Sequence, residues 1–129
     1  MTVSVREDRG CAVVTCEGTY TLSEAREAVM RSLAPFRQSP ARGLIVDVTA
    51  SDMLQGRSSA DLLDTARLVS AERHAFSGRF VAVASSPLAF GLMRMSGAHA
   101  EALGVEAQVC RTYECAVDWV LEGRPAGAC

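Results

Sequence analysis

The chain has 129 residues, of which 49% are hydrophobic and 22% charged, with a formal net charge of -2. This is the composition of one ordinary globular domain. The weak acidity disfavours a nucleic-acid-binding protein, which would carry a basic patch or stripe, and no apolar run approaches the roughly 20 residues that a membrane-spanning helix needs. The N-terminus shows no basic segment followed by an apolar one, so we expect no signal peptide and a cytoplasmic protein.

The N-terminal third predicts a hairpin followed by a helix. Thr2–Arg6 alternates like a half-buried strand, Asp8–Gly10 is a turn signal, and Cys11–Glu17 is a second, more apolar strand. We expect the first strand to lie at the edge of the sheet. Thr21 and Glu24 have the spacing of a capping box that begins the helix. The apolar stripe expected on this helix is Leu22, Ala25, Val29 and Leu33.

The most apolar stretch is Gly43–Thr49, rich in β-branched residues, and it predicts a strand buried on both faces. An amphipathic helix is expected from about Ser58 to Phe76, with its apolar stripe facing the sheet. The loop between them leaves the carboxyl end of a central strand. Open α/β sheets usually place their sites at such ends, so a functional site is expected in this loop. The helix stripe consists of Leu62, Ala66, Val69 and Phe76.

The rest of the chain predicts two more strands, Arg79–Ser85 and Val105–Arg111, each followed by a helix. Ser86 and Pro87 have the pattern of a helix start. The predicted core stripe of that helix is Leu88, Leu92 and Met95. The element order β-β-α-β-α-β-α-β-α predicts an α/β fold whose mixed five-stranded sheet has an N-terminal hairpin, a parallel remainder and about four helices. We expect a single domain over 1–123 and a flexible tail over 124–129.

The cysteines are odd in number, and no pair has the CxxC spacing of a metal site. They are Cys11, Cys16, Cys110, Cys115 and Cys129. We expect all five to be reduced and free of metal, since disulfides are unusual in the cytosol.

Four segments carry a resemblance to a known fold. They are Gly43–Val48, Gly78–Ala84 with Ser86-Pro87 behind it, Phe90–Met95, and Thr112–Val120 with its E-x-A-x-x-W-V ending. Together with the element order, they make the chain resemble the STAS fold of bacterial anti-sigma-factor antagonists and, more closely, the small SpoIIAA-like (STAS/SEC14-type) bacterial proteins. The resemblance implies a regulatory module, not an enzyme, with a protein partner such as an anti-sigma-factor-type kinase.

The helix after the central strand carries the first candidate site. In antagonists of that kind, a serine of an Asp-Ser-[Ser/Thr]-Gly motif is phosphorylated there, and this chain has Gly56-Arg57-Ser58-Ser59-Ala60, which matches at the two serines only. A helix N-terminus favours an anion, and Arg57 is adjacent. Asp52, Arg57, Ser58 and Ser59 are therefore the candidates for phosphorylation or for binding an anion or a partner. Simple capping of the helix by a serine oxygen explains the same serines, and both interpretations stay open.

Phe90, Met93 and Arg94 form the second candidate site because they lie off the predicted core stripe. Exposed Met and Phe side chains make an adaptable contact face for a partner protein. A wide apolar stripe that packs under neighbouring helices or against a dimer partner explains the same residues, and both interpretations stay open. The alternative function is binding of a lipid or another small apolar ligand in a pocket near Phe90–Met95. No nucleophile-and-base arrangement and no nucleotide-binding fingerprint is present, so we expect no catalytic residues, no cofactor and no metal.

Overall fold

The computed structural model describes residues 3–51 and 59–122, and it contains a five-stranded sheet with helices on both faces. The strands are β1 (Val3–Asp8), β2 (Cys11–Gly18), β3 (Leu44–Ser51), β4 (Arg79–Val83) and β5 (Glu106–Cys110). The helices are α1 (Leu22–Leu33), α2 (Ser59–Ala71), α3 (Pro87–Ala102) and α4 (Tyr113–Glu122), with 3-10 turns at Ala34–Phe36 and Arg73–Phe76. The expected tail, 124–129, lies outside the described residues.

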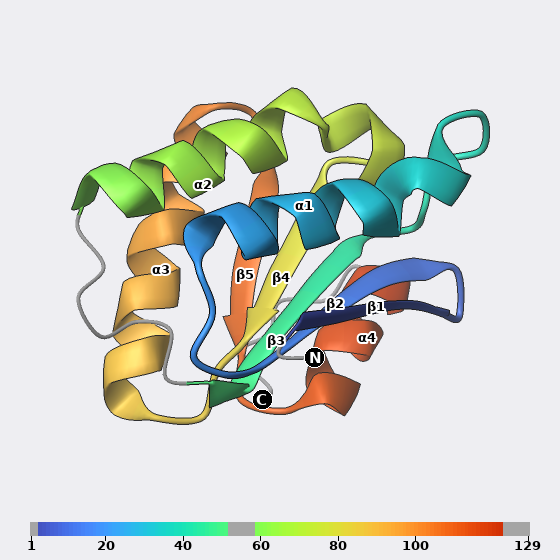
Figure 1. Ribbon diagram of the computed structural model, residues 1–129. Helices are drawn as coiled ribbons and strands as arrows, with labels where there is room; N and C mark the ends of the chain where they lie inside the picture. The colour runs from blue at the N-terminus through green and yellow to red at the C-terminus, as the bar shows by residue number, and fades with distance from the viewer. Residues whose placement is uncertain (1–2, 52–58, 123–129) are drawn as a thin grey trace.

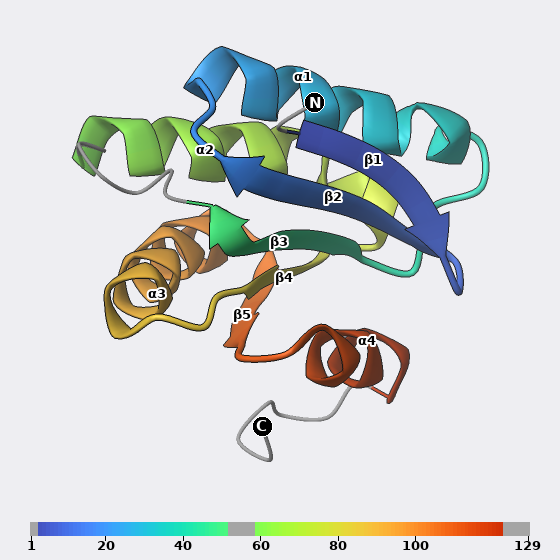
Figure 2. The ribbon, with the colours of Figure 1, turned by 60° about the horizontal axis from the view of Figure 1, so that its bottom comes forward.

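The strand order is β1-β2-β3-β4-β5. β1 pairs with β2 antiparallel, and every other pair is parallel. Figure 2 shows β1 at one edge of the sheet, β5 at the other and β3 in the middle. The predicted mixed sheet, the edge position of the first strand and the central position of the Gly43–Thr49 stretch are all confirmed.

The two faces of the sheet bury different side chains, as the period-2 alternation of a strand requires. Val14 and Leu44 face α1, α2 and α3, whereas Val13 and Ile45 face α4, and all four are fully buried. Figure 1 shows α1, α2 and α3 together on one side and α4 alone on the other. The predicted stripe is buried in the core on the three-helix side: Leu62, Ala66, Val69 and Phe76. The α-helix ends at Ala71, however, earlier than predicted, so Phe76 lies in the 3-10 turn Arg73–Phe76 and not on α2.

Local signals define the first elements as expected. Arg9 and Gly10 form the hairpin turn with φ angles of 52° and 82°. Two central residues with positive φ match the twist of the flanking strands, so the turn fixes the register of β1 against β2. The capping box of α1 is present: Thr21 Oγ1 accepts from the Glu24 N–H at 3.1 Å, and Glu24 Oε1 accepts from the Thr21 N–H at 3.0 Å.

The orientation of α3 differs from the prediction. Leu88 and Met95, expected in the core, are 63% and 47% exposed, whereas Met93 is only 6% exposed. The buried stripe of α3 runs instead through Met93, Ser96, Gly97 and Ala100. A Cβ on Gly97 would lie 3.4 Å from the Ala107 Cβ. The small residues thus let α3 pack closely on β5, and this close packing, not hydrophobicity, sets the rotation of the helix.

The cysteines divide into two groups. Cys11, Cys16 and Cys110 are free and buried, whereas Cys115 in α4 is disulfide-bonded. The prediction that all five thiols are reduced is therefore wrong. Burial raises the pKa of Cys110 to about 11 and also raises the pKa of Cys11. Both buried thiols are therefore protonated and unreactive at neutral pH.

Candidate functional site

Three helices begin at one end of the sheet, where the parallel strands β2, β3 and β4 have their carboxyl ends (Figure 1). Thr21 caps α1, and Ser86 caps α3 by accepting the Ala89 N–H at 3.1 Å. α2 begins at Ser59, directly after the loop that was predicted as a site. This is the end at which open α/β sheets bind their ligands and partners. Of the residues predicted there, 52–58 lie outside the described residues, as does the side chain of Ser59, so Asp52, Arg57, Ser58 and Ser59 stay predictions.

The end of β3 is held by its own side chains. Asp47 Oδ1 accepts from the Thr49 N–H at 3.0 Å and from the Thr49 hydroxyl at 2.7 Å. The Ser51 hydroxyl donates to the Val48 carbonyl at 3.0 Å. These short-range bonds stabilise the strand end from which the loop departs.

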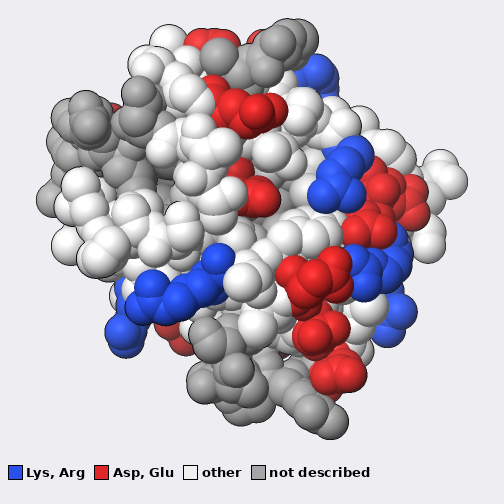
Figure 3. All heavy atoms as spheres, turned by 90° about the horizontal axis from the view of Figure 1, so that it is seen from below, with Lys and Arg blue, Asp and Glu red and all other residues white. Residues whose placement is uncertain are grey.

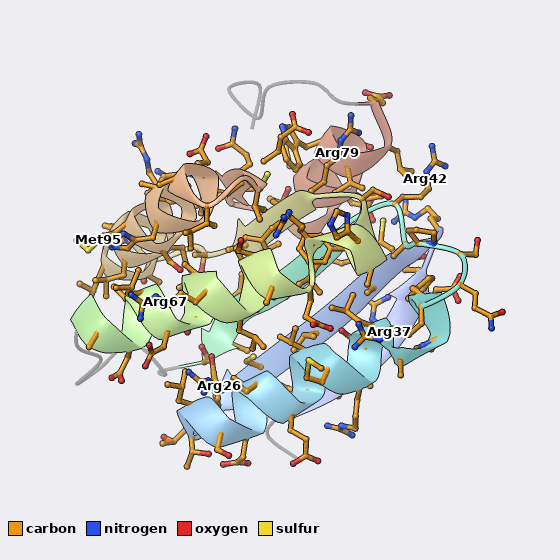
Figure 4. All side chains as sticks on the ribbon, turned by 90° about the horizontal axis from the view of Figure 1, so that it is seen from above. Arg26, Arg37, Arg42, Arg67, Arg79 and Met95 are labelled. Atoms are coloured by element: carbon orange, nitrogen blue, oxygen red, sulfur yellow. The ribbon has the colours of Figure 1, made fainter. Side chains whose placement is uncertain are left out.

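An apolar stripe runs along the outer side of α3. Leu88, Leu92 and Met95 stand at i, i+4 and i+7, so they share one face of the helix, and we call them the α3 stripe. Leu88 and Met95 are exposed and Leu92 is half-buried. Figure 4 shows Met95 at the periphery of the molecule, pointing away from the sheet. This apolar surface adjoins the end of the sheet where α3 and α2 begin.

The predicted face made of Phe90, Met93 and Arg94 is not one surface. Met93 is buried, Phe90 is half-buried and Arg94 is exposed. The Arg111 guanidinium lies 4.3 Å from the centre of the Phe90 ring, a cation–π contact that partly covers it. Only Arg94 therefore remains fully open to a partner.

A cavity of about 50 Å³ lies on the three-helix side, between α1 and α2. Its lining is almost wholly apolar and includes Val14, Cys16, Val29, Leu62, Val69 and Met93. Two ion pairs cross the seam between these two helices. Arg26 of α1 lies 3.7 Å from Asp64 of α2. Arg37, which follows the 3-10 turn after α1, pairs with Glu72, which directly follows α2. Figure 4 shows Arg26 on the side of α1 that faces α2. Of the Phe90–Met95 segment, where a ligand pocket was predicted, only Met93 contributes to this lining.

A polar network joins the hairpin to the first turn of α4. The Tyr113 hydroxyl donates to Asp8 at 2.6 Å, and Arg9 bridges Asp8 and Glu114 at 3.2 Å each. The hydrogen bond from Tyr113, together with Arg9, lowers the pKa of Asp8 below its usual range. Burial and the same hydrogen bond raise the pKa of Tyr113 to about 12. The network keeps Asp8 charged and Tyr113 protonated at neutral pH, which stabilises the docking of α4.

No family model matches the chain, and no curated protein matches it. Two solved structures resemble it. An uncharacterised DUF3478-family protein with a SpoIIAA-like fold from Shewanella loihica is 16% identical, with a TM-score of 0.59 over 92% of this chain and 91% of that one. An anti-sigma factor antagonist from Mycobacterium paratuberculosis is 18% identical, with a TM-score of 0.63 over 93% of each chain. This chain has the SpoIIAA-like fold. The fold predicted from the sequence resemblance is thereby confirmed.

On this SpoIIAA-like fold, acidic and basic side chains are interspersed over the face seen from below in Figure 3. Within residues 3–51 and 59–122, no three His, Cys, Asp or Glu side chains gather as a metal site would require. No helix in the same ranges has the length and hydropathy to cross a membrane.

Proposed function

We propose that this protein is a non-enzymatic regulatory module that binds a partner protein through the start of α2 and the α3 stripe. The observation that carries the proposal is the exposure of Leu88 and Met95, at 63% and 47%, next to the carboxyl ends of the parallel strands. Apolar side chains grouped on a surface mark contact sites. The fold shared with an anti-sigma factor antagonist supports a partner of the anti-sigma-factor kinase type.

In this proposal, Asp52, Arg57, Ser58 and Ser59 supply the polar part of the same site. A phosphate on Ser58 or Ser59 would meet the positive end of the α2 dipole, with Arg57 adjacent in the sequence. Phosphorylation by the partner would then place up to two negative charges at the contact and change its affinity. Mass spectrometry of the protein purified from its source organism tests this part directly.

The proposal is tested by capturing partners from a lysate of the source organism on immobilised protein. Leu88→Gln with Met95→Gln should abolish capture, and Ser58→Asp or Ser59→Asp should change the binding free energy by about 1–3 kcal/mol. The control is Met30→Gln, because Met30 is also exposed, at 39%, but lies on α1. Capture that survives every change at the α3 stripe and at both serines would refute the proposed site.

Binding of a small apolar ligand is the second candidate function, and the apolar cavity between α1 and α2 favours it. The cavity holds about 50 Å³, well below the ~150 Å³ of an engineered cavity that binds benzene. A lipid would therefore have to separate α1 from α2 on entry. Native mass spectrometry of the protein from its own host would reveal a carried ligand.

A further inference from the structure

The edge strand β5 has one unpaired side. Its Glu106 N–H donates to Gly78 O at 2.8 Å, and Cys110 O accepts from the Ala84 N–H at 3.0 Å, so these residues face β4. Because backbone groups alternate along a strand, Ala107 and Val109 direct their N–H and C=O groups away from β4. No strand of the described part of the chain pairs with that side. The Val109 N–H instead donates to the side-chain oxygen of Gln108 at 3.1 Å.

A groove of about 270 Å³ runs beside this edge, between α3 and β5. Its lining consists of Arg94, Gly97, Ala98, Glu101, Ala107, Gln108 and Val109. The middle of the groove is lined by small side chains, and its two ends on α3 carry opposite charges. Another backbone can therefore approach the edge closely, with a cation at one end and an anion at the other.

The charged side chains beside β5 give this edge of the sheet a positive end and a negative end. The helix of a β-α-β crossover runs opposite to its strands, and Gly97 packs on Ala107. Arg94 therefore lies toward the Cys110 end of β5, one turn after Phe90, whose ring Arg111 contacts, and Glu101 lies toward the Glu106 end. Arg94 and Glu101 form no ion pair among the described residues, and Glu106 has only an exposed contact with Arg79 at 3.4 Å. The positive end on the α3 side thus consists of Arg94 and Arg111, and the negative end consists of Glu101, whereas Glu106 lies on the α4 face with Arg79.

We propose that a second copy of this chain docks on β5, antiparallel and about a twofold axis at Gln108, so that the two sheets join into one of ten strands. The axis sets Ala107 of each copy opposite Val109 of the other. These are the residues that face outward, and their pairing forms four backbone hydrogen bonds once each Val109 N–H exchanges the Gln108 side chain for the facing carbonyl. The same axis brings the positive end of each copy against the negative end of the other, as a self-complementary interface requires.

This dimer is independent of the proposed function. Leu88, Leu92 and Met95 lie on a different face of α3 from Arg94, Ala98 and Glu101, so the α3 stripe stays exposed in the dimer. A second copy is favoured over a foreign peptide because the pattern of charges at this edge is complementary to itself.

The dimer is tested by analytical sedimentation of the full chain. Concentrations up to about 1 mM are used so that even a weak dimer is detected. Arg94→Glu alone and Glu101→Arg alone should each weaken dimerisation by about tenfold, because each reversal places like charges at both symmetry-related ends. Mixing the two variants should restore the dimer, because only the mixed pair has opposite charges at both ends. Arg42→Glu, an exposed arginine with no ion pair among the described residues, is the control and should have no effect.

The register is tested by Gln108→Cys under mild oxidation. Residues facing each other at a non-hydrogen-bonded antiparallel position have Cα atoms about 4.5 Å apart, which suits a disulfide. This variant should form a covalent dimer, whereas Ser4→Cys, exposed on the opposite edge strand β1, should behave like the parent protein. The proposal is overturned if the chain stays monomeric, if it dimerises without sensitivity to either reversal, or if Gln108→Cys crosslinks no better than Ser4→Cys. If this edge binds a strand of another protein and not a second copy, the purified chain stays monomeric, which is the first of these outcomes.

Discussion

The two faces of the sheet are packed in different ways. On one side, α4 alone lies against the sheet, and Val117 and Val120 are almost completely buried there. On the other side, three helices share the sheet, and α1 and α2 leave a cavity of about 50 Å³ beneath exposed ion pairs. The sheet is therefore closely packed under α4, whereas the three-helix side leaves unfilled space between α1 and α2. We therefore expect that adding a methyl group under α4 lowers the free energy of unfolding strongly, whereas a polar substitution at the seam between α1 and α2 changes it little.

Gly43→Ala gives the largest effect. A Cβ at position 43 would lie 2.7 Å from Val120 Cγ1 and 2.9 Å from Cγ2. Val120 is fully buried on α4, so it cannot move aside, and the helix must shift outward. We expect a loss of about 1–3 kcal/mol in the free energy of unfolding, measured by urea denaturation.

The matched control is Gly91→Ala, where a Cβ would meet nothing within 4 Å on an exposed helix. Alanine has a higher helix propensity than glycine, so this change should stabilise the protein by up to about 1 kcal/mol. Equal stability of the two variants would contradict the close packing of α4.

Tyr113→Phe removes the hydrogen bond from α4 to Asp8, and its effect should be smaller and depend on pH. The pKa of Asp8 lies below 3.8 in the folded protein, so this interaction stabilises the fold above that pH and is lost as the pH falls through the folded pKa. The variant should melt at a lower temperature than the parent at pH 7. Thermal melts by circular dichroism should show the difference shrinking below pH 3.8, and a constant difference down to pH 2 would contradict the coupling.

Sequence patterns predicted the fold because its decisive signals are local. The capping box at Thr21, the turn at Arg9 and Gly10 and the apolar run Gly43–Thr49 each act within a few residues, and the structure has all three. The rotation of α3 was mispredicted because hydrophobicity selects Leu88 and Met95, whereas the contact with β5 selects the small residues. The bond from Tyr113 to Asp8 joins positions 105 residues apart, and no pattern in the sequence predicts such a pair.

Arg26→Gln at the seam between α1 and α2 should have the smallest effect. Arg26 and Asp64 are 3.7 Å apart with side chains 46% and 45% exposed, and Asp64 also has Arg67 at 3.8 Å. Water screens such a pair, and Asp64 keeps a second cation when Arg26 is lost. We expect a change of less than about 0.5 kcal/mol in urea denaturation, and less still in high salt. A larger, salt-dependent loss would mean that ion pairs, not apolar packing, hold α1 against α2, and the contrast between the two faces of the sheet would then be wrong.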